Sequence, residues 1–314
     1  MSAAKHFSRL TAAREQELLQ AVRLLGQWLD DLMLSGLIRL QADSEKLNEI
    51  SSRMVDAGLP GVARRLRLWP EKIRDASDWT DFVLMQISEL YLFVRSFERL
   101  DQLQDAEKED LLNVAGVVFK KTDFTDQLIL MDEWLCLGQV KEKEEKLIVI
   151  RSWFYGLQSK RFALFLEYQF NRFVKTKPVY TGRVYRSSVQ FYPSAYPQRI
   201  RDIQTDLVTQ LKDGTLSGLN VREALDHFCK VVERNPFIRQ QIYLIADAQF
   251  YSEGERWYVA DRKGEGILLT NPEPEIPRIL SYCSGPDTLL AGEYGSGSMR
   301  ILSAILDRTV ISIT

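Results

Sequence analysis

WLCLGQV at residues 134–140, LIVIRSWFY at 147–155 and FALFLEYQF at 162–170 are the three stretches that decide the fold. Each is short and rich in β-branched and aromatic residues, and turn-forming or charged segments separate them. They predict a meander of three strands. In the third run, the alternation of apolar residues with a set that includes Glu167 and Gln169 predicts one buried and one wetter sheet face.

The chain after this meander continues with strand-like patterns. We expect a helix over Val221–Glu233, capped by Asn220, and an extended connector over Asn271–Pro277, because Pro272, Pro274 and Pro277 each remove a backbone donor. The further strands that we expect are Val179–Tyr185, Val189–Tyr192, Gln241–Tyr251, Arg256–Ala260, Gly266–Thr270, Thr288–Tyr294 and Met299–Leu302.

The chain before residue 120 has helical periodicity instead. Apolar residues alternate steps of three and four from Leu18 to Leu32, with Thr11 as the expected cap. Shorter patterns of the same period mark further helices, and the longest pattern runs from about Trp79 to Leu100. The expected helical stretches also include Leu47–Met54, Pro60–Leu66 and Asp105–Val118.

The two periodicities together predict an α+β fold. We expect residues 1–120 to form an antiparallel helical bundle, and residues 121–314 to form a mostly antiparallel β-sheet or barrel that carries a helix. The 314 residues suffice for two such domains, and an apolar content of 45% is ordinary for a packed core.

Charge and cysteine content restrict the class of protein. The 41 basic and 43 acidic residues leave a formal charge of -2, so nucleic acid or membrane binding would need a local patch. No apolar run approaches the roughly 20 residues that cross a bilayer, and the first ten residues lack the core of a signal peptide. Cys136, Cys229 and Cys283 are sparse and odd in number, which predicts reduced core thiols and a cytoplasmic protein.

The sequence contains little that points to catalysis. His6 and His227 are its two histidines, and His227 and Cys229 lie two positions apart on a predicted helix, so they point in different directions. Closely spaced pairs of zinc ligands are absent, and the glycines at 285, 292, 295 and 297 lack the context of a phosphate-binding loop. We therefore expect no catalytic residue, no metal and no cofactor.

One basic cluster is a candidate contact surface. Arg64 and Arg67 lie three residues apart on one predicted helix, so one face could present guanidinium groups to phosphates or carboxylates. The alternative is a solvated or internally paired face, since Asp56, Glu71, Asp75 and Asp78 are close by. The candidate residues are Arg53, Arg64, Arg65, Arg67, Lys72 and Arg74.

The aromatic segment FYPSAYP at 191–197 is a second candidate surface. Its prolines limit it to a strand end followed by a turn. Half-buried aromatic side chains there could stack on bases, or they could pack as a corner of the sheet.

Several segments together resemble bacterial SWIM zinc-finger proteins. Residues 14–40 are similar to the helix that follows the zinc motif, and RMVDA at 53–57 with LPGVARRL at 59–66 resembles the next block. EWLCLGQ at 133–139, VQFYPSAYP at 189–197 and GEY at 292–294 are similar to later blocks of that family.

The resemblance implies a bacterial protein encoded beside MoxR-type AAA+ ATPases and von Willebrand A proteins. The Cys-x-Cys and Cys-x-His ligands that define the family do not occur here, so zinc and DNA binding by that finger do not carry over. We expect a finger-less relative or one half of a split protein.

Our leading functional hypothesis is a non-enzymatic scaffold or adaptor. Its expected partner is an AAA+ ATPase, a von Willebrand A protein or a separate zinc-finger polypeptide. The alternative is a nucleic-acid-associated module that uses the stretch from Arg53 to Arg74, and a weaker third option is an enzyme with an unrecognised carboxylate site.

Overall fold

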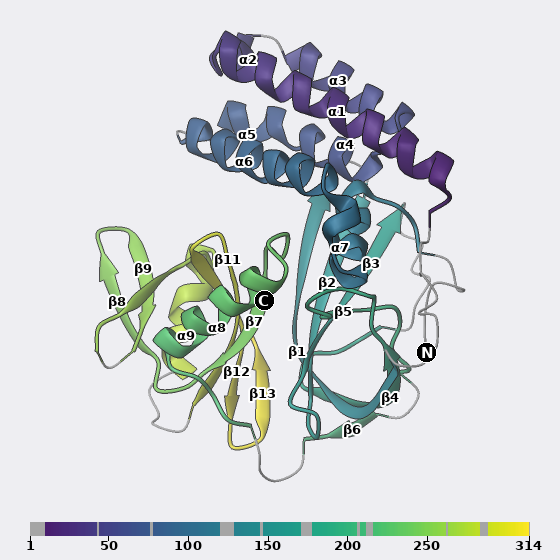
Figure 1. Cartoon of the computed structure of the whole chain (residues 1–314). Coiled ribbons are helices and arrows are strands. Elements are labelled where there is room, and N and C mark those ends of the chain that lie inside the picture. The colour runs from purple at the N-terminus through teal and green to yellow at the C-terminus, as the bar shows by residue number, and fades with distance from the viewer. Residues whose placement is uncertain are drawn as a thin grey trace. The chain divides into compact units, whose positions relative to one another are not determined.

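The computed structural model describes residues 10–42, 44–75, 78–119, 129–144, 147–170, 178–205, 208–211, 216–261, 263–282 and 288–313. His6, Cys283, Gly285 and the expected domain boundary near residue 120 lie outside these ranges. The chain forms two compact units (Figure 1). Unit 1 comprises residues 1–123 with Pro193–Ala195, and unit 2 comprises residues 124–192 and 196–314.

Unit 1 is helical. Thr11 caps the first helix as expected, because its hydroxyl accepts from the backbone N–H of Arg14. The longest predicted helix ends at Phe97, and a 3-10 turn follows it. Two short helices, α2 and α5, were not predicted from the sequence. The helices are α1 Ala12–Ser35, α2 Arg39–Ala42, α3 Ser44–Asp56, α4 Pro60–Arg67, α5 Trp69–Asp75, α6 Trp79–Phe97, η1 Leu100–Gln102 and α7 Asp105–Ala115.

The two longest helices, α1 and α6, run antiparallel. A methyl group on Gly26 would lie 3.2 Å from Cγ1 of Val94, and one turn later the hydroxyl of Tyr91 donates to Asp30. Residue numbers thus rise along α1 as they fall along α6. Both helices bury one apolar face in the core of unit 1. None of the helices within the described ranges is long and apolar enough to cross a membrane.

Unit 2 contains two open sheets, each mixed but mostly antiparallel. The first sheet has the order β5-β3-β2-β1-β4-β6. It contains the predicted meander, with Leu135 opposite Tyr155 and Trp153 opposite Leu164. Its strands are β1 Ile129–Glu144, β2 Leu147–Gly156, β3 Phe162–Phe170, β4 Arg183–Gln190, β5 Arg199–Ile200 and β6 Val208–Gln210.

The second sheet has the order β7-β11-β12-β10-β9-β8, with β13 paired to β12. Helix α8, Val221–Arg234, begins after the predicted cap Asn220, whose side chain accepts from Glu223 N. Helix α9 spans Ile276–Tyr282. The strands are β7 Gln241–Ile245, β8 Gln249–Glu253, β9 Arg256–Ala260, β10 Gly266–Leu269, β11 Leu289–Gly295, β12 Ser298–Leu306 and β13 Thr309–Ser312.

Four local predictions in unit 2 are wrong. The segment Asn271–Pro277 is not extended: a 3-10 turn, Glu273–Glu275, leads into α9, because the first turn of a helix tolerates proline. The expected strand Gln241–Tyr251 is two strands, since Asp247 adopts a left-handed φ of 53° between them. The expected strands Val179–Tyr185 and Val189–Tyr192 are replaced by the single strand β4. Ser187 is buried within this strand and accepts a hydrogen bond from Gln204 N.

The fourth wrong prediction concerns the faces of β3. Leu164 packs in the core between the two sheets, while Ala163 and Phe165 pack in another core on the opposite face. Both faces of the first sheet are therefore buried near its centre. The second sheet also buries both faces, because α8 and α9 cover the side that faces away from the first sheet. Unit 2 thus has two packed sheets with helices outside one of them (Figure 1).

Substitution of Gly61 tests the packing of α4 on the end of α7. A methyl group at Gly61 would lie 2.3 Å from the carbonyl oxygen of Val114 and 2.8 Å from the nitrogen of Gly116. We expect Gly61→Ala to lower the free energy of unfolding by about 2 kcal/mol, because backbone must move apart. Chemical denaturation measures this.

The control is Ser52→Ala, an alanine substitution at an exposed position of α3 that adds no atoms. It should change the free energy of unfolding by no more than about 0.5 kcal/mol. Equal stability of the two variants would contradict the close contact at Gly61.

Candidate functional site

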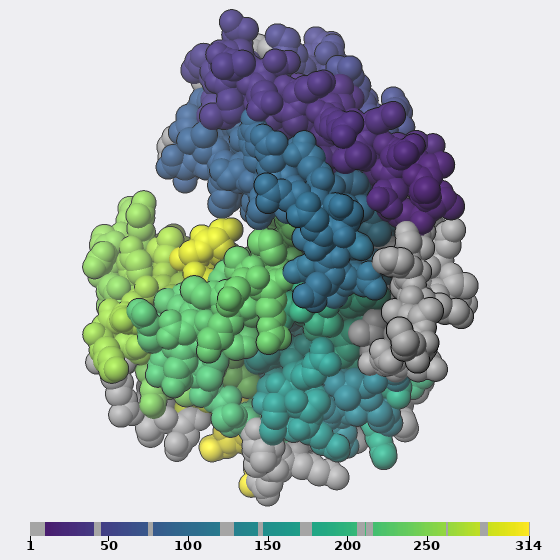
Figure 2. All heavy atoms as spheres, in the orientation of Figure 1, coloured from purple at the N-terminus to yellow at the C-terminus, as the bar shows by residue number. Residues whose placement is uncertain are grey.

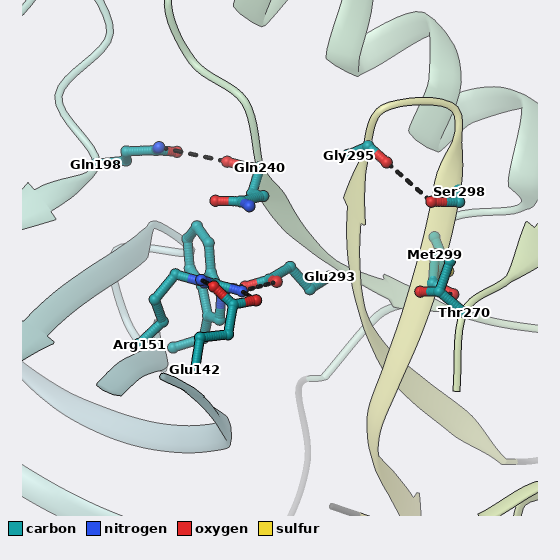
Figure 3. A network of polar contacts seen from close by, with 10 residues as sticks. Glu142, Arg151, Gln198, Gln240, Thr270, Glu293, Gly295, Ser298 and Met299 are labelled. Carbon is teal, nitrogen blue, oxygen red and sulfur yellow. Dashed lines mark hydrogen bonds and ion pairs between the residues drawn. The ribbon is translucent and has the colours of Figure 1, made fainter. Parts of the chain in front are cut away.

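The most strongly connected polar cluster of unit 2 is centred on Arg151 of β2. Its Nε and Nη2 donate to the two carboxylate oxygens of Glu293 on β11, at 3.1 and 2.9 Å. Its Nη1 and Nη2 donate to Glu142 of β1 at 2.5 and 2.9 Å. The indole N–H of Trp153 donates to Glu293 at 2.5 Å. We call these four residues the Arg151 cluster; Figure 3 labels Glu142, Arg151 and Glu293.

The cluster joins the two sheets through a buried ion pair. The side chains of Arg151 and Glu293 are 9% and 6% exposed, whereas Glu142 is 45% exposed at the rim. Burial by itself lowers the pKa of Arg151, but its hydrogen bonds to Glu142 and Glu293 outweigh this effect and raise the pKa. The guanidinium therefore stays charged between two carboxylates.

This geometry favours a structural clamp over acid–base chemistry. Arg151 uses its donors on both glutamates, and both oxygens of Glu293 accept hydrogen bonds from within the cluster. A general acid or base must instead exchange protons with a substrate. The cluster could not be predicted from sequence patterns, because Arg151 and Glu293 lie 142 residues apart. An arginine within the apolar run 147–155 was the one usable signal.

Another buried carboxylate of unit 2 also has a local role. Asp132 of β1 is 3% exposed and accepts from the backbone N–H groups of Glu133, Gln158 and Ser159, at 2.6, 3.1 and 2.8 Å. It thus holds the turn between β2 and β3 in place. Within the described ranges, no group of three or more histidine, cysteine or acidic side chains could hold a metal ion.

His227 and Cys229 on α8 have different surroundings. Nδ1 of His227 lies 3.2 Å from the Tyr243 hydroxyl, and its ring packs edge-on against Tyr243 and near Tyr196. Burial, with the charges of Lys230 and Arg234, lowers the pKa of His227. Cys229 is exposed, so the prediction of a core thiol is wrong there, whereas Cys136 is buried.

The first two residues of the aromatic segment, Phe191 and Tyr192, pack in unit 2 where the chain leaves β4. Phe191 is 1% exposed, and the guanidinium carbon of Arg161 lies 4.2 Å from its ring centroid. The guanidinium carbon of Arg199 lies 4.5 Å from the ring centroid of Tyr192. An arginine therefore lies over one face of each of these two rings, in the position that a stacked base would take.

The predicted basic residues lie on three consecutive helices of unit 1. Helix α4 contacts both α3 and α5. Arg65 is partly buried and lies 3.5 Å from Glu89 of α6, so it belongs to an internal ion pair. The other five are exposed: Arg53 on α3, Arg64 and Arg67 on α4, and Lys72 and Arg74 on α5.

Unit 1 also buries a carboxylate on α7. Asp110 is 6% exposed, and one of its oxygens accepts from the backbone N–H of Ala195 at 2.9 Å. Burial raises the pKa of Asp110 to about 6, and repulsion from Glu109 and Glu107 adds to this rise. Hydrogen bonds from Ser194 and Ala195 lower the pKa but do not outweigh burial.

Comparison with known families identifies the helical unit. Residues 13–115 match the model of the SWIM-associated four-helix bundle domain. The match covers α1 to α7 and accounts for the resemblance that the sequence carries in this region. The comparisons with curated proteins and with solved structures find no match.

Removing the buried acceptor of the Arg151 cluster should destabilise unit 2. We expect Glu293→Gln to lower the free energy of unfolding by about 3 kcal/mol, because it removes the buried one of the two carboxylates that pair with Arg151. The matched control is Glu142→Gln, which makes the same change at the exposed rim and should cost less than about 1 kcal/mol. A loss of equal size at both positions, measured by chemical denaturation, would be inconsistent with a buried clamp.

The raised pKa of Asp110 predicts a pH-dependent stability of unit 1. The folded state holds the proton more tightly than the unfolded chain, so the contribution of Asp110 is largest below its unfolded pKa near 4 and is lost as pH rises through about 6. We expect the difference in unfolding free energy between Asp110→Asn and the wild type to grow in favour of the variant from pH 4 to 7. Denaturation at several pH values measures this difference, and a constant value would refute the prediction.

Proposed function

We propose that the protein is a non-enzymatic adaptor that binds a protein partner through unit 1. The observation that carries this proposal is a group of exposed apolar side chains where α1 ends: Met33, Leu34 and Ile38 are 46%, 87% and 67% exposed. We call them the α1-end patch. Three large apolar residues exposed within six positions favour a contact surface, whereas single ones are common on any protein.

The chemistry of unit 2 supports the same proposal. Its buried carboxylates Asp132, Asp261 and Glu293 are engaged by backbone N–H groups or within the Arg151 cluster. The candidate stacking rings carry arginines on their faces. An adaptor requires no converging catalytic groups, only a stable scaffold and an accessible surface.

The family match supports a role in assemblies that contain SWIM proteins. A SWIM-associated bundle suits a chain whose partner is a zinc-finger polypeptide. The resemblance further implies a MoxR-type AAA+ ATPase or a von Willebrand A protein as the partner. We propose these three classes of protein as the ones to test.

The alternative is a nucleic-acid-associated module. It is favoured by the five exposed basic side chains on α3, α4 and α5. Exposed acidic residues, among them Asp56 and Glu71, lie on the same helices and weaken the attraction of this surface for phosphates.

A pair of double variants distinguishes the two functions. We expect the double variant Leu34→Gln, Ile38→Gln to bind the purified partner at least about tenfold more weakly. In the wild type, burial of the two apolar side chains on binding contributes to the affinity, and the glutamines lose this contribution. Arg64→Gln with Arg67→Gln is the matched control and should leave this affinity unchanged. Binding is measured by calorimetry with each of the three candidate partners from the same host.

The converse result would favour the nucleic-acid module. In that case DNA or RNA would bind, its affinity would fall steeply as salt rises, and the Arg64→Gln, Arg67→Gln variant would lose it. Absence of binding to all three partner classes would leave the adaptor proposal without support.

A further inference from the structure

Helix α6 carries a second exposed apolar surface, on the side that faces away from the core of unit 1. Leu84, Met85 and Leu92 are 41%, 41% and 42% exposed, and Ser88 lies between them. Positions 84, 88 and 92 are one turn apart, and Met85 lies nearly two turns before Leu92, so all four share one side of the helix. Figure 2 shows α1 in purple and α6 in blue at the surface of unit 1.

Charges of opposite sign flank this surface. Asp81 precedes Ser88 by seven residues and Arg95 follows it by seven residues, so both lie on the same side of α6. Both are exposed, and the side chain of Arg95 is 67% exposed with a 3.1 Å contact to Glu98. We call the residues Asp81, Leu84, Met85, Ser88, Leu92 and Arg95 the α6 stripe.

The α6 stripe is complementary to a reversed copy of itself. Leu84 and Leu92 lie four residues before and after Ser88, and Asp81 and Arg95 lie seven residues before and after it. If two α6 helices pack antiparallel with Ser88 at the two-fold axis, Leu84 meets Leu92 of the second copy. Asp81 then faces Arg95 of the second copy, and the same ion pair repeats on the other side of the axis.

We propose that the protein forms a two-fold symmetric dimer through the α6 stripe. The occupant of this surface is a second copy of the chain. When the order acid, leucine, serine, leucine, base is reversed, each acid faces a base and each leucine faces a leucine, and this happens only if the two helices are antiparallel. A two-fold interface requires such self-complementarity. Along the α6 stripe, Asp81, Leu84, Ser88, Leu92 and Arg95 follow one another at intervals of three or four residues. Side chains at these intervals interdigitate where two helices pack together.

This inference is independent of the proposed partner. It concerns the α6 stripe, whereas partner binding is assigned to the α1-end patch, so each can fail without the other. A dimer would present two α1-end patches, which raises the effective affinity for a partner that carries several binding sites.

Charge exchange tests the dimer directly. Sedimentation of the full chain over roughly 1 to 100 µM should show a monomer–dimer equilibrium for the wild type. Asp81→Arg alone, or Arg95→Asp alone, places like charges opposite each other twice and should weaken self-association at least about tenfold. The double variant D81R with R95D restores both pairs and should dimerise as the wild type does.

Mixing the two single variants gives the sharpest result. The D81R chain carries a positive charge at both ends of the α6 stripe, and the R95D chain carries a negative charge at both ends. The mixture should therefore form heterodimers although each variant alone remains mainly monomeric. The control Glu49→Arg makes the same charge change on the exposed side of α3 and should leave dimerisation unchanged.

The outcomes that overturn the proposal are equally definite. A wild type that stays monomeric over the whole concentration range excludes the dimer. Dimerisation that is unchanged in both single variants places the interface elsewhere. Circular dichroism of every variant verifies that α6 is still folded, which exposed positions should allow.

Discussion

The buried pair of Arg151 and Glu293 is the interaction on which the arrangement of unit 2 depends. A guanidinium that loses its water costs several kcal/mol unless a carboxylate meets it in good geometry. Arg151 belongs to the first sheet and Glu293 to the second, so the sheets can pack only where these two side chains meet. The apolar contacts around them are far less directional, and Leu135, Leu244 and Leu302 would tolerate small shifts.

Other buried groups in the described part of unit 2 also hold elements in place. Its buried charged and aromatic groups are used to hold elements together: Glu293 joins the sheets, Asp132 holds a turn, and Arg161 covers Phe191. Unit 1 differs, because its long helices bury one face and leave large apolar side chains exposed at the end of α1 and along α6. We therefore propose that the helices provide the surfaces for association and that the sheets provide the scaffold.

Local rules predicted the elements well wherever one pattern dominated. Thr11 and Asn220 cap their helices because a side-chain oxygen can satisfy a nearby N–H without help from the rest of the fold. The α+β class and the meander followed from the change of hydrophobic period. The prolines at 272–277 misled the prediction, since the same residue fits an extended connector and the first turn of a helix. The short helices α2 and α5 had too few residues to show a period.

The sequence by itself determined most of the helices and strands, and which charges and apolar residues each of them carries, because these depend on neighbours within a few positions. It also placed Arg64 and Arg67 on one helix, α4, whereas the helix α5 that carries Lys72 and Arg74 was not predicted. Only the tertiary structure decided that Arg65 pairs with Glu89, that both faces of β3 are buried, and that Arg151 meets Glu293. The physical reason is that a contact between distant residues depends on how sheets and helices pack, and no local preference of the chain encodes that arrangement.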